Sequence, residues 1–191
     1  EKNYETAYLS ATRGGGGQNF IGTHLKDNLG LIRTHELLEA RKIDGGKQFF
    51  STAIDFGYSK DPDESLKFWD EEKILSDFVW IIRKFRPDII ITRFNQTPNI
   101  THGHHTASAM LADKAFNLAS DPSAFPEQLK YVKIWKPKRL MWNTSRRFFN
   151  LDDYDIDKMI KIDVGVYNNK MGKSYNEIAS ESRSMHKSQA F

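Results

Sequence analysis

The sequence predicts an α/β protein, a three-layer sandwich with a mostly parallel sheet. Two observations support this fold class. Short β-branched and aromatic runs alternate with amphipathic helical segments, and the run of three isoleucines at residues 89–91 is apolar throughout. Such continuous apolar runs are typical of parallel strands buried on both faces. Sheets of this kind bind ligands beyond the carboxyl ends of their strands, so we look for functional residues there.

The expected elements follow one another as strand, helix, strand, helix, strand, helix, strand. Strand-like residue types predict strands at residues 5–12, 47–54, 89–91, 139–142 and 161–166. Apolar residues at helical spacing predict helices at residues 29–41, 73–85, 105–118 and 174–189. Gly45 with Gly46 ends the first helix, Asp61 with Pro62 begins a short further one, and Pro87 ends the next. This alternation is typical of a parallel sheet with helical crossovers.

Composition limits the classes of function. The 191 residues suit a single domain over residues 1–191. The chain has 28 basic and 25 acidic residues that are scattered along it, so we expect no nucleic-acid partner. It has no cysteine, which excludes a disulfide framework, a thiolate nucleophile and a cysteine zinc site. Any metal must therefore be held by His, Asp or Glu.

The sequence does not indicate the cellular compartment of the protein. Its longest apolar run is far too short to span a membrane, so we expect no transmembrane helix. The lack of cysteine suits the cytoplasm and a periplasm-like, exported setting equally well. The cellular compartment therefore stays unknown.

A histidine cluster is the sharpest local feature. Three of the six histidines lie in Thr101-His102-Gly103-His104-His105, after a predicted buried strand and at a predicted helix start. Neutral imidazole is a good zinc ligand, and catalytic zinc usually keeps one position for water. The cluster therefore indicates a metal site at the strand end. A solvent-exposed polar turn, or a histidine that caps a helix, is the alternative.

A glycine-rich loop follows the first predicted strand. Arg13 precedes four consecutive glycines, which allow positive φ and a close backbone approach to an anion or a sugar. The loop lacks the Gly-Lys-Ser/Thr of a phosphate-binding loop, so a nucleotide-dependent enzyme is disfavoured. A flexible surface loop is the alternative. Arg33 and Glu36 share one face of the next helix, where an ordinary surface ion pair is the simplest interpretation.

Taken together, these motifs resemble the PIG-L/LmbE-like family of zinc-dependent N-acetylglucosaminyl deacetylases. The resemblance rests on a strand that runs into Thr12-Arg13-Gly14, on Arg33-x-x-Glu36, and on Arg86-Pro87-Asp88 before an isoleucine strand and a histidine loop. It covers residues 6–143, and residues 185–189 look like the family's closing helix. The four glycines and the His-Gly-His-His sequence are similar to a branch of larger bacterial proteins.

The resemblance implies a Rossmann-like fold and a site with one zinc. His105 would be a metal ligand, and His102 would polarise the acetyl carbonyl or stabilise the oxyanion. Arg13 and Arg33 would bind the substrate. We therefore expect a hydrolase that removes an N-acetyl group from a glucosamine-containing substrate. A non-catalytic carbohydrate-binding or scaffold domain is the alternative.

The sequence departs from the family pattern in two places. The loop reads His-Gly-His-His where the family usually has H-P-D-H, so His104 replaces an acidic residue. No H-P-D-D-E segment occurs in the chain, although in the family it supplies two zinc ligands and the general base. We therefore expect an N-terminally truncated polypeptide that lacks the first strand and is inactive alone. It would self-associate or retain a separate N-terminal piece.

Overall fold

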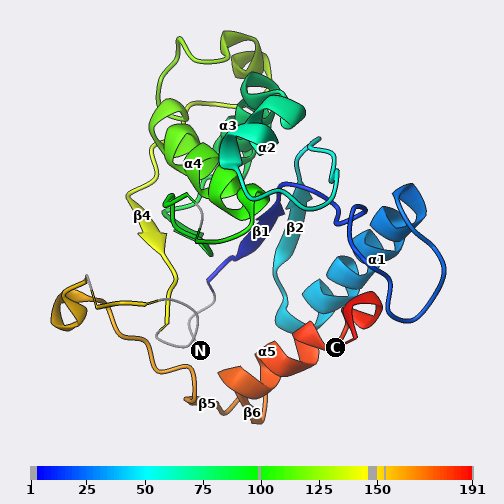
Figure 1. The fold of residues 1–191 in the computed structure, drawn as a ribbon. Helices are drawn as coiled ribbons and strands as arrows, with labels where there is room; N and C mark the ends of the chain where they lie inside the picture. The colour runs from blue at the N-terminus through cyan, green and yellow to red at the C-terminus, as the bar shows by residue number, and fades with distance from the viewer. Residues whose placement is uncertain (1–3, 99, 146–149, 153, 191) are drawn as a thin grey trace. The chain divides into compact units, whose positions relative to one another are not determined.

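Parallel strand pairs joined through helices form the framework of the protein (Figure 1). The computed structural model describes residues 4–98, 100–145, 150–152 and 154–190. The chain divides into two compact units. Unit 1 comprises Glu1–Phe50, Asp55–Gly57 and Leu151–Phe191, and unit 2 comprises Ser51–Ile54 and Tyr58–Asn150. A single domain over residues 1–191 stays a prediction.

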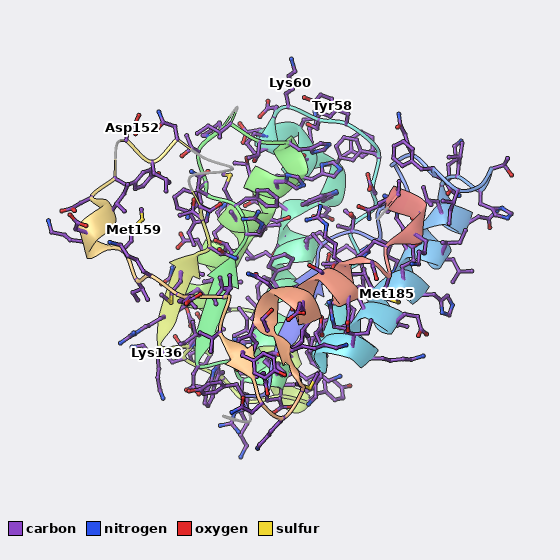
Figure 2. All side chains as sticks on the ribbon, turned by 90° about the horizontal axis from the view of Figure 1, so that it is seen from below. Tyr58, Lys60, Lys136, Asp152, Met159 and Met185 are labelled. Carbon is purple, nitrogen blue, oxygen red and sulfur yellow. The ribbon has the colours of Figure 1, made fainter. Side chains whose placement is uncertain are left out.

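Unit 1 is built on a parallel strand pair, β1 with β2, which is connected by the helix α1. Its elements are β1 (Ala7–Ser10), α1 (Asp27–Asp44), β2 (Lys47–Phe50), η2 (Ile156–Lys158), β5 (Tyr167–Asn168), β6 (Lys173–Ser174), α5 (Tyr175–Arg183) and η3 (Lys187–Gln189). Helix α5 packs against α1 and begins with a capping box between Ser174 and Glu177. Met185 lies in the short segment between α5 and η3 (Figure 2).

Unit 2 combines a second parallel pair, β3 with β4, with a group of packed helices. Its elements are α2 (Pro62–Trp69), α3 (Glu71–Phe85), β3 (Ile89–Thr92), α4 (Gly103–Leu118), η1 (Pro126–Lys130) and β4 (Arg139–Trp142). Helix α4 contacts both α2 and α3 (Figure 1). The interior between these helices is apolar and includes Leu66, Trp69, Ile74, Phe78, Val79, Ile82, Ala107, Leu111 and Ala115.

A buried arginine closes one end of this helical group. Arg83 is 1% exposed, and its guanidinium donates to backbone carbonyls that include those of Leu118 and Ala119 at the end of α4. It also donates to the side-chain oxygen of Gln128 at 3.1 Å. The last carbonyls of a helix have no partner within the helix. Arg83 therefore satisfies groups that burial would otherwise leave without hydrogen bonds.

The predicted fold class is confirmed: the protein is α/β, and four of its six strands form parallel pairs within the described residues. The strand predicted at residues 139–142 has the observed bounds of β4. Gly45 ends α1 in the left-handed conformation with φ of 75°, and Asp61 caps α2 by accepting from the backbone N–H of Asp63. Among the described residues, no helix is both long enough and apolar enough to cross a membrane.

Three predictions about strands and helices are wrong in detail. Residues 89–91 form a strand, but Ile89 is 47% and Ile91 62% exposed. Burial alternates along β3, so only the face that carries Ile90 is covered within the described chain. The strand predicted at residues 161–166 is absent, because that segment hydrogen-bonds to the start of α5 through the carbonyls of Val164 and Val166 instead of pairing with a strand.

The last predicted helix is also divided. Residues 174–189 form α5 and then the separate 3-10 turn η3. A polar turn thus replaces the continuous helix expected from spacing alone.

Candidate functional site

The glycine-rich loop, residues 13–18, begins three residues after β1 ends. The guanidinium of Arg33 on α1 holds it, since Nη1 donates to the carbonyl of Gly14 and Nη2 to that of Gln18, both at 2.7 Å. The backbone N–H of Gly17 donates to the carbonyl of Gly14 at 3.3 Å, which closes a turn within the loop. The loop therefore has specific hydrogen-bond partners outside itself.

Close packing against Arg33 explains glycine at two positions of this loop. Gly14 has φ of +73°, and a Cβ there would lie 2.8 Å from Cδ of Arg33. A Cβ on Gly17 would lie 2.5 Å from Nη1 of the same side chain. Both approaches are closer than carbon and nitrogen atoms tolerate, so the guanidinium would have to move if either glycine carried a side chain.

Arg13 lies at the carboxyl ends of β1 and β2. Its Nη1 donates to Oγ1 of Thr34 at 3.0 Å, and its guanidinium carbon lies 4.1 Å from the centre of the Phe50 ring. Phe50 is the last residue of β2, and the arginine side chain itself is exposed. An exposed guanidinium at this edge of a parallel strand pair is placed to donate to a polar ligand.

Arg33 and Glu36 both contact Ser188 in the C-terminal turn η3. Nε of Arg33 donates to Oγ of Ser188 at 3.3 Å. The carboxylate of Glu36 accepts from the backbone N–H of Ser188 at 2.6 Å and from its hydroxyl at 2.8 Å. Glu36 is 8% exposed, so the interpretation as a surface ion pair is wrong. Spacing on the helix placed the two side chains on one face, but their shared partner lies about 150 residues later in the sequence.

In unit 2, the histidine loop forms the N-terminus of α4. His102 is the N-cap residue, and its Nδ1 accepts from the backbone N–H of His104 at 3.1 Å. The backbone N–H of Ser59 approaches Nε2 of His102 at 3.3 Å. The ring of Tyr58 meets the imidazole edge-on, with centroids 4.9 Å apart. Figure 2 shows Tyr58 beside Lys60, whose side chain points away from the protein. The helix-capping alternative is thus observed for this residue.

Backbone N–H groups face both ring nitrogens of His102. A neutral imidazole has one nitrogen that accepts and one that donates, so it can accept only one of these two hydrogen bonds at a time. Nε2 can donate to another oxygen only when the hydrogen bond from Ser59 is given up. Such a donor would stabilise negative charge on that oxygen.

The other two histidine rings have different environments. His104 is 8% exposed; its Nδ1 lies 2.9 Å from Oγ of Ser65, and its ring packs against Trp69. His105 is exposed, and its ring stacks on Phe94 with centroids 3.8 Å apart. His104 therefore belongs to the interior of unit 2, whereas His105 is accessible.

His105 is held in the state that binds metals. Although the residue as a whole is exposed, one face of its ring is covered by Phe94. Partial burial of the ring, with the nearby His102, His104 and Arg93, lowers the pKa of His105 to about 4. Its imidazole is therefore neutral at physiological pH and can offer a lone pair. The ring centroids of His102 and His105 are 5.5 Å apart. Within the described part of the chain, however, no group of three or more His, Cys, Asp or Glu could hold a metal ion.

The predicted site residues fall into two groups. Arg13 and Arg33 flank the glycine-rich loop in unit 1, and His102 and His105 lie at one helix start in unit 2. A site shared by the two groups stays a prediction. Sequence reasoning missed Ser188 and Phe94. Phe94 follows the β3 strand by two residues and could have been found from that position. Ser188 lies in residues 185–189, which resemble the family's closing helix, but the resemblance did not assign it a role.

Comparisons with known proteins identify a family and a fold. The family profile described as PIG-L, GlcNAc-PI de-N-acetylase, matches residues 1–116. A solved structure of N,N'-diacetylchitobiose deacetylase from Pyrococcus horikoshii, complexed with its inhibitor MPG, is similar with a TM-score of 0.64 and 18% identity. The similarity covers 97% of this chain and 60% of that one.

A second solved structure, the conserved protein TT1542 from Thermus thermophilus, is similar with a TM-score of 0.50 and 22% identity. The similarity covers 75% of this chain and 56% of that one, so this chain spans little more than half the length of either protein. At these identities the likeness shows the fold alone. No curated protein matches the sequence.

Proposed function

Because the chain belongs to the PIG-L family of GlcNAc-PI de-N-acetylases, we propose that it contributes to a zinc-dependent hydrolase. The enzyme would remove an N-acetyl group from a glucosamine-containing substrate. The observation that carries the proposal is the pair of His102 and His105 at the N-terminus of α4, where one imidazole caps the helix and the other is neutral and accessible. The chitobiose deacetylase acts on a related class of substrate, an N-acetylated sugar.

His105 is the metal ligand that we assign to this chain. Its neutral imidazole and its exposure suit zinc, and stacking on Phe94 fixes the orientation of the ring. Zinc would supply the Lewis acid that makes water a nucleophile at neutral pH. The remaining ligands are not provided by any group of described residues, so we route no catalytic step through the metal.

His102 is the proposed oxyanion stabiliser. The N-cap hydrogen bond to Nδ1 holds the imidazole, and in the tautomer with the proton on Nε2 the ring gives up the hydrogen bond from Ser59. Nε2 would donate to the acetyl oxygen as the carbonyl carbon becomes tetrahedral and negative charge develops. Loss of one such donor typically lowers the rate by about 10²–10³. His102→Ala should therefore reduce turnover in the complete enzyme and leave zinc content unchanged.

The substrate side of the proposal rests on Arg13 and Arg33. Arg13 is exposed at the strand ends and would donate to sugar oxygens. Arg33 shapes the glycine-rich loop beside it through Gly14 and Gln18. A guanidinium has five N–H donors in a fixed plane, which suits neighbouring oxygens of a sugar.

Metal binding is the first test. We expect this chain to bind zinc below stoichiometry, since His105 is one ligand of an incomplete set, and His105→Ala should remove what is bound. The measurement is elemental analysis after dialysis. His24→Ala, in a loop of unit 1, is the matched histidine control and should change nothing. Tight, stoichiometric zinc that survives His105→Ala would show that the site is elsewhere.

Sugar binding then separates an enzyme from a binding module. We expect N,N'-diacetylchitobiose to shift the amide resonances of residues 13–17. Acetate release, measured on the same samples, should be close to zero for this chain alone. Sugar binding by a chain whose zinc content is unchanged by His105→Ala would favour the non-catalytic carbohydrate-binding alternative. A chain that shows no response to sugar at any zinc concentration would contradict the proposed substrate class.

A further inference from the structure

We propose that Ser188 and Glu36 are positioning residues for the glycine-rich loop, so that the C-terminal turn η3 belongs to the substrate side of the site. This inference rests on the proposed function, because it takes the loop to be a sugar-binding segment. The hydrogen bonds that carry it lie entirely within unit 1.

Ser188 uses every polar group that it has. It is fully buried, its hydroxyl donates to Glu36 at 2.8 Å, and the same oxygen accepts from Nε of Arg33 at 3.3 Å. Its backbone N–H donates to Glu36 at 2.6 Å, and its carbonyl accepts from the N–H of Phe20 at 3.0 Å. A buried side chain with this many partners has one allowed orientation.

A chain of hydrogen bonds runs from Glu36 to the loop. The carboxylate of Glu36 orients Ser188, and Ser188 holds Nε of Arg33. Because the guanidinium is planar and rigid, fixing Nε also fixes the direction of its other donors. Those donors reach the carbonyls of Gly14 and Gln18 at 2.7 Å. The loop conformation is therefore set in part by two buried residues, Glu36 and Ser188, that act through Arg33.

The turn also contacts the segment that follows the loop. The N–H of Phe20 donates to the carbonyl of Ser188, so η3 holds Gly14 and Gln18 through Arg33 and holds Phe20 directly. Arg13 adjoins the first of these points. If the turn were released, the exposed guanidinium of Arg13 and the glycine backbone would no longer be held in fixed positions relative to each other. We therefore expect weaker sugar binding rather than loss of the fold.

Hydrogen exchange tests the mechanical part of the proposal. In Ser188→Ala, the amides of Gly17 and Phe20 should exchange about tenfold faster, because the hydroxyl that joins Glu36 to Arg33 is gone. Ser184→Ala is the matched control, since Ser184 lies in the same tail and its hydroxyl donates to the nearby carbonyl of Glu181 at 2.7 Å. The control should leave loop exchange unchanged. Equal loop protection in both variants would overturn the proposal.

A second pair of variants covers the case in which Ser188→Ala fails to fold. Glu36→Gln keeps the size of the side chain and one accepting oxygen, and Glu39→Gln changes an exposed residue of the same helix. Only Glu36→Gln should speed exchange at Gly17 and Phe20. If neither variant does so, Glu36 does not position the loop.

Titration with N,N'-diacetylchitobiose tests the link to the ligand. We expect Ser188→Ala to weaken sugar binding about tenfold while the melting temperature of the Ser184→Ala control and its binding stay as in the wild type. A loosened loop with unchanged sugar affinity would contradict the positioning role. A wild-type chain that binds no sugar would contradict the proposed function itself, and the exchange data would still show whether the turn holds the loop.

Discussion

The two units are stabilised in different ways. The buried apolar residues of unit 2 lie between packed helices, whereas in unit 1 fewer apolar side chains, Leu29 and Ala40 among them, are buried on α1. Unit 2 has a buried polar centre, Arg83, at one end of this packing, whereas unit 1 relies mainly on polar networks that join distant segments. In one of them Asp44 binds Arg41 and Ser182, and Arg41 lies over the ring of Tyr8 at 3.6 Å. The other connects Arg33, Glu36 and Ser188.

This difference affects how the candidate functional residues of each unit are held in place. Apolar packing is non-directional and changes little with pH. A network of charged and hydroxyl groups is directional and fixes loops to particular positions, but it fails when one member is removed. Unit 1 therefore presents a loop whose geometry depends on a few side chains, and unit 2 presents histidines on a firmly packed helix.

The largest expected effect is in the core of unit 2. Leu111→Ala should lower the free energy of unfolding by about 3 kcal/mol, because it leaves a cavity at a fully buried position. Leu31→Ala on α1, where the side chain is 60% exposed, should cost less than about 0.5 kcal/mol. Urea unfolding measures both. Equal losses of stability in the two variants would mean that the buried position of Leu111 does not contribute the expected packing energy to unit 2.

Replacing Asp44 should weaken unit 1 by about 2 kcal/mol, because the carboxylate accepts charged hydrogen bonds. Burial alone would raise the pKa of Asp44, but hydrogen bonds from Arg41, the N–H of Gly46 and Ser182 outweigh it and hold the pKa below 3.8. The folded state therefore binds the proton more weakly than the unfolded state. The stabilisation that Asp44 provides is therefore present above the pKa of the unfolded state, about 4, and is lost as the pH falls through the lower pKa of the folded state.

Asp44→Asn should remove that part of the acid dependence. Unfolding curves measured between pH 2 and pH 7 would show a shallower loss of stability than in the wild type. Asp88→Asn is the control, since Asp88 forms an exposed pair with Lys138 and should leave the profile unchanged. A wild-type slope retained in Asp44→Asn would exclude Asp44 as its source.

A comparison of two glycines with similar φ distinguishes the cost of backbone strain from the cost of close packing. Gly45 has φ of +75°, and a Cβ added there would have no neighbour within 4 Å, so Gly45→Ala should cost about 1 kcal/mol from the left-handed conformation alone. Gly14 adds the contact with Arg33, and Gly14→Ala should cost about 1 kcal/mol more. Thermal unfolding of the two variants measures the difference. Equal shifts would indicate that Arg33 moves away without cost.

The smallest expected effect is at an exposed ion pair of α1. Nζ of Lys42 lies 2.5 Å from Oε1 of Glu39, and both side chains are more than half exposed. Glu39→Ala should change the free energy of unfolding by at most about 0.5 kcal/mol. A larger loss in urea unfolding would mean that unit 1 also depends on surface charge pairs, in addition to its buried networks.

Local patterns predicted most helices and their ends. The apolar spacing of α3, the capping Asp61 before Pro62 and the glycine after α1 all act over a few residues, so their structural consequences can be read from the sequence. The same holds for the histidine loop, whose position at a helix start follows from the strand before it. Which ring is accessible did not follow, because the burial of His104 depends on Ser65 and Trp69 from another helix.

Residue patterns alone were enough to infer the fold class, the family resemblance and the four candidate residues Arg13, Arg33, His102 and His105. The contact of Glu36 and Arg33 with Ser188, the capping of α4 by His102 and the covering of one face of β3 became known from the folded structure. The difference comes from how far apart in the sequence the interacting residues lie. Periodicity and capping are set by neighbours within one or two turns, whereas a hydrogen-bond partner about 150 residues away and the covering of a strand depend on how the whole chain packs.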